Sequence, residues 1–161
     1  MELKIVGEEV VSRLRGAVEV IRDGVPERST EGPESPGDVP VSRLASYKIA
    51  SVGPQDSLLD VVAALVDGDV GIVTVVDDQA TKGVVSERDV IDAVYDGADL
   101  ATVWAADIMQ TNLIHVDHEM AAREAGLQMH HKGIRHLLVG DPPRGIVSIR
   151  DIVGVLGGAE V

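Results

Sequence analysis

The sequence of 161 residues contains no cysteine and no phenylalanine, and it has only one tryptophan and two tyrosines. The absence of cysteine excludes disulfide bonds, thiolate catalysis and thiolate metal ligands, and it is consistent with a reducing compartment. A core has to be built from Val, Ile, Leu and Ala, which suits short buried strands. Bases are also scarce, with 14 Lys and Arg against 27 Asp and Glu. Because nonspecific binding to nucleic acid requires a basic surface, we expect no nucleic-acid partner.

Long apolar runs are missing too. No stretch approaches the roughly 18 uncharged apolar residues of a membrane-spanning helix, and the first residues, Met1-Glu2-Leu3-Lys4, do not form a signal peptide. We therefore expect a soluble, cytoplasmic protein without a membrane partner. A phosphate loop with lysine, GxGxxG and GxSxG are absent as well. The prediction is a protein that is not an enzyme, with a small enzyme acting on nucleotides as the weaker alternative.

The clearest pattern is a repeated heptapeptide. Gly83-Val84-Val85-Ser86-Glu87-Arg88-Asp89 returns as Gly145-Ile146-Val147-Ser148-Ile149-Arg150-Asp151, with five of seven positions identical. In both copies a glycine opens a short β-branched run, and Ser-x-Arg-Asp then begins a helical pattern. The order strand, helix, strand, strand, helix occurs twice. The sequence therefore predicts a mixed α/β (α+β) fold made of two β-α-β-β-α repeats.

Three regions follow from these patterns. Apolar residues at helical spacing over 8–22 predict one amphipathic helix, which we expect to pack on the repeats or on a partner subunit. Residues 23–40 are rich in Pro, Gly and acids and predict a flexible linker. The chain is thus divided into an N-terminal region (1–40), a first repeat (41–104) and a second repeat (105–161).

Both repeats are predicted to contain the same elements. The first helix is expected to be capped by Asp56, and a connecting helical segment is expected at 99–109. Aligning Val139 with Val76 requires a shift of 63 residues and aligning Asp151 with Asp89 a shift of 62, which predicts a one-residue difference between the two turns. Strands are predicted at 49–52, 70–76, 113–116 and 134–139 and after Gly83 and Gly145, and helices at 56–68, 87–95, 119–131 and around 152–156.

Ser-x-Arg-Asp has two interpretations. Ser and Asp at this spacing form a capping box, which alone explains both residues. A helix N-terminus also offers free amides and the positive end of the helix dipole to a phosphate, for which arginine is a suitable neighbour. The aspartate can accept hydrogen bonds from ribose hydroxyls, as an acidic residue does in dinucleotide sites of another fold. A cap does not require the arginine, so its recurrence as Arg88 and Arg150 favours binding.

The repeat resembles the cystathionine-β-synthase (CBS) domain, whose copies end in glycine, two apolar residues, Ser or Thr, two variable residues and Asp. The resemblance covers about residues 41–157. It implies a tandem pair (a Bateman module) with pseudo-twofold symmetry that binds an adenine nucleotide in the cleft between its repeats. The implied ligand is AMP, ADP or ATP, with S-adenosylmethionine or a dinucleotide as alternatives. CBS pairs usually associate in twos through their helices, so the resemblance also implies a homodimer.

The charge distribution favours the second repeat as the site of an anion. Residues 42–110 carry 12 acids and 4 bases, whereas residues 111–161 carry 6 acids and 5 bases. Arg135 and His136 are expected to stand where the first repeat has Ile72 and Val73, and the resemblance implies that residues at these positions contact phosphate. The alternative is an exposed strand edge. Titration of the histidines of the second repeat near pH 6 to 7 would add positive charge near a bound phosphate and make the affinity depend on pH.

The resemblance also implies that the segments before each first strand, 47–49 and 111–114, wall a purine pocket; plain strand packing is the alternative. All five histidines lie in the second repeat, but no HExxH pattern or cysteine accompanies them, so we predict no metal site. No catalytic residue is predicted. The candidate nucleotide-binding residues are Ser148, Arg150, Asp151, Arg135, His136, Thr111, Leu113, Ile134 and Ile146 in the second repeat, and Ser86, Arg88, Asp89, Lys48 and Ile49 in the first.

The predicted function is that of a regulatory ligand sensor, in which a nucleotide favours one arrangement of the two repeats. Such a sensor acts through its N-terminal helix or through an effector protein that the sequence does not identify. The alternative is a structural or protein-interaction module with vestigial sites, in which Ser-x-Arg-Asp only caps helices.

Overall fold

The computed structural model describes residues 35–158, which belong to one compact unit. The helix predicted at 8–22 and most of the linker predicted at 23–40 lie outside the described residues. Within the described range, no helix is both long enough and apolar enough to span a bilayer.

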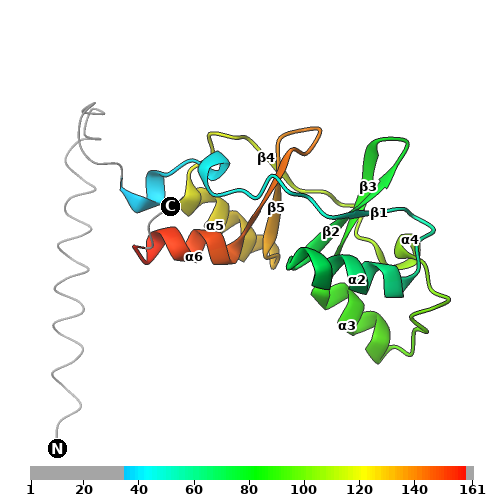
Figure 1. The fold of residues 1–161 in the computed structure, drawn as a ribbon. Helices are drawn as coiled ribbons and strands as arrows, with labels where there is room; N and C mark the ends of the chain where they lie inside the picture. The colour runs from blue at the N-terminus through cyan, green and yellow to red at the C-terminus, as the bar shows by residue number, and fades with distance from the viewer. Residues whose placement is uncertain (1–34, 159–161) are drawn as a thin grey trace, which may run out of the picture. The chain divides into compact units, whose positions relative to one another are not determined.

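The described chain is a mixed α/β fold with two three-stranded sheets (Figure 1). In both sheets the first strand is parallel to the second, and the third is antiparallel to it, in the orders β1-β2-β3 and β4-β5-β6. The predicted β-α-β-β-α order is confirmed. The elements are the 3-10 turns η1 (Pro36–Asp38) and η2 (Val41–Arg43), then β1 (Ser51–Val52), α2 (Leu58–Gly68), β2 (Ile72–Asp77), β3 (Ala80–Ser86), α3 (Glu87–Tyr95), α4 (Ala105–Ile108), β4 (His115–Val116), α5 (Ala122–Lys132), β5 (His136–Val139), β6 (Gly145–Ser148) and α6 (Ile149–Leu156).

The first helix begins later than predicted, because Ser57 and not Asp56 is its cap. Oγ of Ser57 accepts a hydrogen bond from the amide of Asp60 at 3.2 Å, and the Asp60 carboxylate accepts one from the amide of Ser57 at 2.9 Å. This exchange satisfies two free amides, whereas Asp56 accepts a hydrogen bond from the amide of Gly53 in the preceding turn. The connecting segment predicted at 99–109 is α-helical only over α4.

The strand pairing changes the predicted alignment of the two repeats. His136 pairs with Ser148 as Ile72 pairs with Ser86. His136 is therefore the counterpart of Ile72, and its predicted match to Val73 is wrong. The offset between repeats is 64 residues in these strands and 62 in the motifs, so the two hairpins differ by two residues and not by one. A bulge in the β2–β3 hairpin accommodates part of the extra length.

Burial determines this register. Val73 and Leu137 occupy equivalent positions and point into the cores, with 0% and 1% of their surfaces exposed. Arg135 then corresponds to Gly71, not to Ile72. The carbonyl groups of Arg135 and Gly71 both accept a hydrogen bond from the first residue of the following motif helix, at 2.8 and 3.1 Å. A shift by one residue would turn every side chain of the strand to the other face of the sheet.

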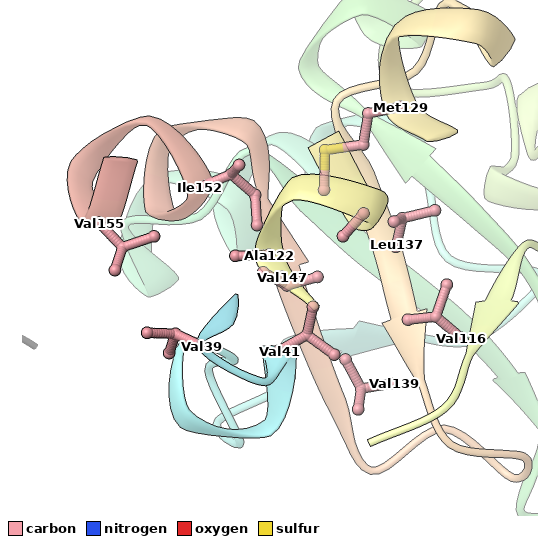
Figure 2. Close-up of a cluster of buried hydrophobic side chains, with 11 residues drawn as sticks. Val39, Val41, Val116, Ala122, Met129, Leu137, Val139, Val147, Ile152 and Val155 are labelled. Carbon is pink, nitrogen blue, oxygen red and sulfur yellow. The ribbon is translucent and has the colours of Figure 1, made fainter. Parts of the chain in front are cut away.

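Each sheet closes an aliphatic core with its helices, as the scarcity of aromatic residues predicts. The second core draws on α5 and α6, which pack side by side (Figure 2). It also contains Val39, which lies at the end of the segment predicted as a flexible linker, and Val41, which begins the first repeat in the sequence, so the chain is packed at these two residues. Conversely, Ala105 begins the second repeat in the sequence but is fully buried in the first core.

Two pairs of backbone hydrogen bonds hold these exchanged segments. Ser46 bonds with Ile146 of β6 in both directions, at 2.8 and 2.9 Å, and Gln110 bonds with Val84 of β3 in the same way, at 2.8 and 3.0 Å. Each repeat is therefore completed by the segment that leads into the other repeat. Ser46 and Gln110 therefore occupy equivalent positions beside β6 and β3.

Candidate functional site

Both motif helices begin with the same set of hydrogen bonds. Oδ2 of Asp89 accepts from the amide and hydroxyl of Ser86 at 2.7 and 2.5 Å, and Oδ2 of Asp151 accepts from those of Ser148 at 2.8 and 2.6 Å. Each serine Oγ accepts in turn from the aspartate amide, at 3.4 and 3.3 Å. The predicted capping boxes are therefore present at α3 and α6.

A capping box does not by itself define a binding site, because α2 has one as well. Ser57 donates to Asp60 from its amide and hydroxyl at 2.9 and 2.5 Å. These hydrogen bonds lower the pKa of the exposed Asp60 carboxyl below its usual value, although the sequence gives no reason to place a ligand there. What distinguishes α3 and α6 is the place where their first turns lie.

The motif helices begin beside the sheet faces that point away from the two cores. On β6, Gly145 and Val147 are buried, whereas Ile146 and Ser148 alternate with them, and β3 shows the same alternation. On these faces, Ile72, Thr74 and Leu138 are nearly fully buried although they belong to neither core. Their burial requires that something other than the helices of their own repeat covers them.

The two repeats meet beside these faces. A Cβ atom placed on Gly71 would lie 3.1 Å from Nε2 of His136 and 3.4 Å from a carboxylate oxygen of Glu87. His136 of β5 therefore lies against the chain that enters β2, and the first residue of α3 is beside them. Because His136 pairs with Ser148 and Glu87 follows Ser86, both motif helices begin next to this junction between the repeats.

His136 connects the junction to the second motif electrostatically. Burial of the half-buried ring lowers its pKa below the usual 6.5. Glu87 and Asp151 act in the opposite direction, and Arg135 and Arg150 add to the lowering. Beside the second motif, the imidazole of His136 therefore favours its neutral form and lies within electrostatic range of the Asp151 carboxylate and of two guanidinium groups.

The second carboxylate oxygens of the two motif aspartates differ. Oδ1 of Asp89 accepts a hydrogen bond from Nε2 of Gln110 at 3.0 Å. Within residues 35–158, Oδ1 of Asp151 has no side-chain donor of this kind, and the equivalent segment carries Ser46. Gln110 was not among the predicted site residues, because its place beside the first motif depends on the exchange of segments between the repeats.

The structure brings together most residues predicted for the second site. Ser148 and Asp151 form the start of α6. Close to this start, the charges of Asp151, Arg135 and Arg150 act on His136. Ile146 lies on the same strand face as Ser148 and pairs with the exchanged segment at Ser46. Ile134, by contrast, packs against the second core.

The remaining predicted residues are more dispersed. Arg88 pairs along its own helix with Asp92, with 3.6 Å between Nε and Oδ2, and both side chains are exposed. Lys48 is exposed, and its carbonyl accepts a hydrogen bond from Oγ of Ser46 at 3.4 Å. Leu113 donates its amide to the carbonyl of Thr111 in the stretch between α4 and β4. Ile49 is half-buried just before β1. In the part of the chain described, no three His, Asp or Glu side chains are arranged to hold a metal ion.

The family model for the CBS domain matches residues 41–96 and 105–158 of this chain. Together these matches cover more than half of the sequence, and the chain belongs to the CBS-domain family, with two copies of the domain. The resemblance inferred from the repeated motif is therefore confirmed.

The chain is also similar to known proteins. An uncharacterised protein of Methanopyrus kandleri is 32% identical over 122 residues, which are 73% of this chain and 62% of the relative, so the chain spans less than two thirds of that protein. The crystal structure of an uncharacterised conserved protein from Pyrococcus horikoshii has a TM-score of 0.71 at 22% identity, covering 78% of this chain and 96% of that one. A CBS-domain protein of Pyrobaculum aerophilum, solved in complex with AMP, has a TM-score of 0.63 at 25% identity, covering 74% and 98%.

Proposed function

We propose that this chain is a regulatory module, without catalytic activity of its own, that binds AMP, ADP or ATP beside the second motif helix. The observation that carries the proposal is the carboxylate of Asp151. Its Oδ2 is held by Ser148, whereas its Oδ1 has no side-chain donor among the described residues. A ribose presents two adjacent hydroxyl groups to such an oxygen. The AMP complex of the Pyrobaculum protein supports an adenine nucleotide as the ligand.

The phosphate groups are assigned to the first turn of α6 and the bases around it. A helix N-terminus offers unpaired amides and the positive end of the helix dipole. Arg135 and Arg150 are exposed beside it, and both act on the charge of His136. Guanidinium groups suit phosphate oxygens because they donate two parallel hydrogen bonds. The apolar side chains of Ile146 and Leu113 are assigned to the purine, which has two flat apolar faces.

Regulation follows from the position of His136. The ring of His136 lies against Gly71 of the first repeat, and the backbone of His136 pairs with Ser148 in the second. A nucleotide at the start of α6 therefore acts beside a side chain that packs across the junction. A ligand that binds one arrangement of the repeats more tightly shifts the population toward it. We propose that an effector protein in the cytoplasm reads this arrangement.

We also propose that the module is a homodimer. Large apolar side chains are exposed on the outer faces of four helices, and exposed apolar surface of this kind marks protein interfaces. Isologous pairing is the commonest closed arrangement of identical chains. The exposed side chains are Leu59 and Val66 of α2, Ile91, Val94 and Tyr95 of α3, Leu127 of α5, and Val153 and Leu156 of α6.

Thermal unfolding with increasing AMP, ADP or ATP tests the proposed ligand. A ligand that binds only the folded chain stabilises it by about 2.7 kcal/mol at a concentration 100 times the dissociation constant. We therefore expect the midpoint of unfolding to rise with at least one of the three nucleotides. S-adenosylmethionine and a dinucleotide are tested in parallel, and release of phosphate from ATP is measured to detect turnover.

The alternative function is a structural or protein-interaction module whose motifs only cap helices. The capping box of Ser57 and Asp60 favours it, because the same geometry occurs away from the motif helices. Such a scaffold would unfold at the same temperature at every nucleotide concentration.

A further inference from the structure

We infer that Gln110 closes the first of the two pseudo-equivalent sites, so that the chain binds a single nucleotide, at the second repeat. This inference rests on the proposed function and adds the number of ligands and the residue that sets it. The two motif carboxylates differ in the hydrogen bonds that they accept. Asp89 accepts three hydrogen bonds, two from the amide and hydroxyl of Ser86 on Oδ2 and one from the side-chain amide of Gln110 on Oδ1. Asp151 accepts only the two from Ser148 in the described structure.

The exchanged segments explain why the two sites differ. Gln110 is held beside β3 by its backbone bonds with Val84, and Ser46 is held beside β6 by its backbone bonds with Ile146. Both positions therefore face a motif helix from the same side. A glutamine is long enough to place its amide on the carboxylate of Asp89, whereas the hydroxyl of Ser46 is bonded to the carbonyl of Lys48.

The glutamine amide occupies the oxygen that a ribose hydroxyl would use. Each carboxylate oxygen has about two lone-pair sites, so a nucleotide at α3 can place both ribose hydroxyls on Oδ1 only if the hydrogen bond between Gln110 and Asp89 breaks. A hydrogen bond to a charged group is worth about tenfold or more in a binding constant, and partial exposure keeps this one at the lower end. The closure is therefore a competition with the ligand within the chain.

The surroundings of the first site offer little to offset this competition. At the position of Arg135 the first repeat has Gly71, and at the position of Ile149 it has Glu87, whose carboxylate lies beside Gly71. Arg88 is turned along its helix toward Asp92. A phosphate at α3 thus meets an added negative charge and lacks one guanidinium group that is present at α6.

Exchanging the residues at the two equivalent positions tests the inference. Calorimetric titration with AMP and with adenosine measures the number of ligands per chain for the wild type, for Gln110→Ser and for Ser46→Gln. These positions pair through their backbones, so the side-chain changes leave the bridges to Val84 and Ile146 in place. We expect one ligand per wild-type chain. In Gln110→Ser we expect a second ligand, because adenosine should bind the first site about tenfold more tightly than it does in the wild type. Ser46→Gln is expected to weaken the remaining site by a similar factor.

Asp89→Asn locates the second ligand. It is expected to leave the wild-type affinity unchanged and to remove the second ligand of Gln110→Ser. Two ligands per wild-type chain, or no change in Gln110→Ser, would overturn the closure by Gln110 while leaving the proposed function intact. A wild type that binds neither AMP nor adenosine would overturn both.

Discussion

Three aspartates in the described chain cap a helix in the pattern Ser-x-x-Asp, and they differ in what their second carboxylate oxygens contact. Asp60 caps α2 on an exposed surface, Asp89 accepts a further hydrogen bond from Gln110, and Asp151 has no further side-chain donor in the described residues. An ionised carboxylate has about four lone-pair sites on its two oxygens, so capping and ligand binding are compatible. The pattern Ser-x-x-Asp identifies the cap in all three cases, and only the surroundings distinguish a site from a cap.

Removing the serine hydroxyl separates these two roles. Ser148→Ala and Ser57→Ala each delete the oxygen that accepts from the aspartate amide, and loss of a cap costs about 0.5–2 kcal/mol. We expect both variants to lower the free energy of unfolding in urea by similar amounts. Only Ser148→Ala is expected to weaken AMP binding, because only that helix begins at the proposed site. Equal AMP affinities for the two variants would contradict the assignment.

His136 gives the stability a dependence on pH. Burial lowers its pKa in the folded chain below 6.5, so the unfolded chain takes up a proton at a higher pH than the folded chain does. The folded state therefore loses stability as the pH falls from about 6.5 toward the lowered folded value, and this contribution is fully present above 6.5. Glu87 and Asp151 limit the loss, whereas Arg135 and Arg150 increase it.

His136→Gln keeps a polar side chain at the junction and removes the titration. Urea unfolding of both proteins at pH 7.5, 6.5 and 5.5 compares them, with the other four histidines present in each. We expect the difference in unfolding free energy between wild type and variant to shift in favour of the variant as the pH falls. A difference that is constant across this pH range would show that His136 does not titrate abnormally.

Among the elements, those with local signals were predictable. Helix α3 lies at the predicted residues, 87–95, because Ser86 caps it and its apolar residues repeat at helical spacing. The buried strand β2 follows from its β-branched run. The predicted cap of α2, Asp56, was wrong. Asp56 and Ser57 are both good caps, and only the partner Asp60 decides between them.

Long-range pairings were not predictable from local patterns. The match of His136 to Ile72 depends on which strand residues face the cores, and a heptapeptide count does not contain that information. The exchange that places Val41 in the second core and Ala105 in the first joins segments far apart in sequence. For the same reason Ser148 and Asp151 were found from the motif, and Gln110 was not.

The exchange predicts how fragments behave. The fragment 41–104 lacks Ala105 and Gln110, which complete the first core and its sheet, and it carries Val41, which packs in the second core. We expect this fragment to be unstable or to associate. The fragment 47–110 contains the exchanged segment and is expected to keep more helix by circular dichroism and to unfold at a higher urea concentration. A cooperative, monomeric melt of 41–104 at least as stable as that of 47–110 would contradict the exchange.

At the scale of the whole molecule, the exposed apolar helix faces predict association. Val153 of α6 is 61% exposed and Ile91 of α3 is 66% exposed, so a charge at either position costs little in the single chain. Light scattering at micromolar concentration is expected to give twice the chain mass for the wild type and the chain mass for Val153→Glu. Gln55→Glu, which adds the same charge in an exposed turn, is the control and should remain dimeric. A wild type with the mass of one chain would end the proposal of a homodimer.

We propose that an adenine nucleotide binds at the second repeat through Asp151. Calorimetric titration of Asp151→Ala, Asp89→Ala and Arg135→Ala with adenosine and with AMP tests it most directly. Loss of hydrogen bonds to a charged group costs about 1.5–3 kcal/mol, so Asp151→Ala should weaken adenosine and AMP alike. Arg135→Ala should weaken AMP much more than adenosine and reduce the salt dependence of the remaining affinity. Asp89→Ala is expected to leave binding unchanged, and loss of binding in Asp89→Ala with normal binding in Asp151→Ala would contradict the account.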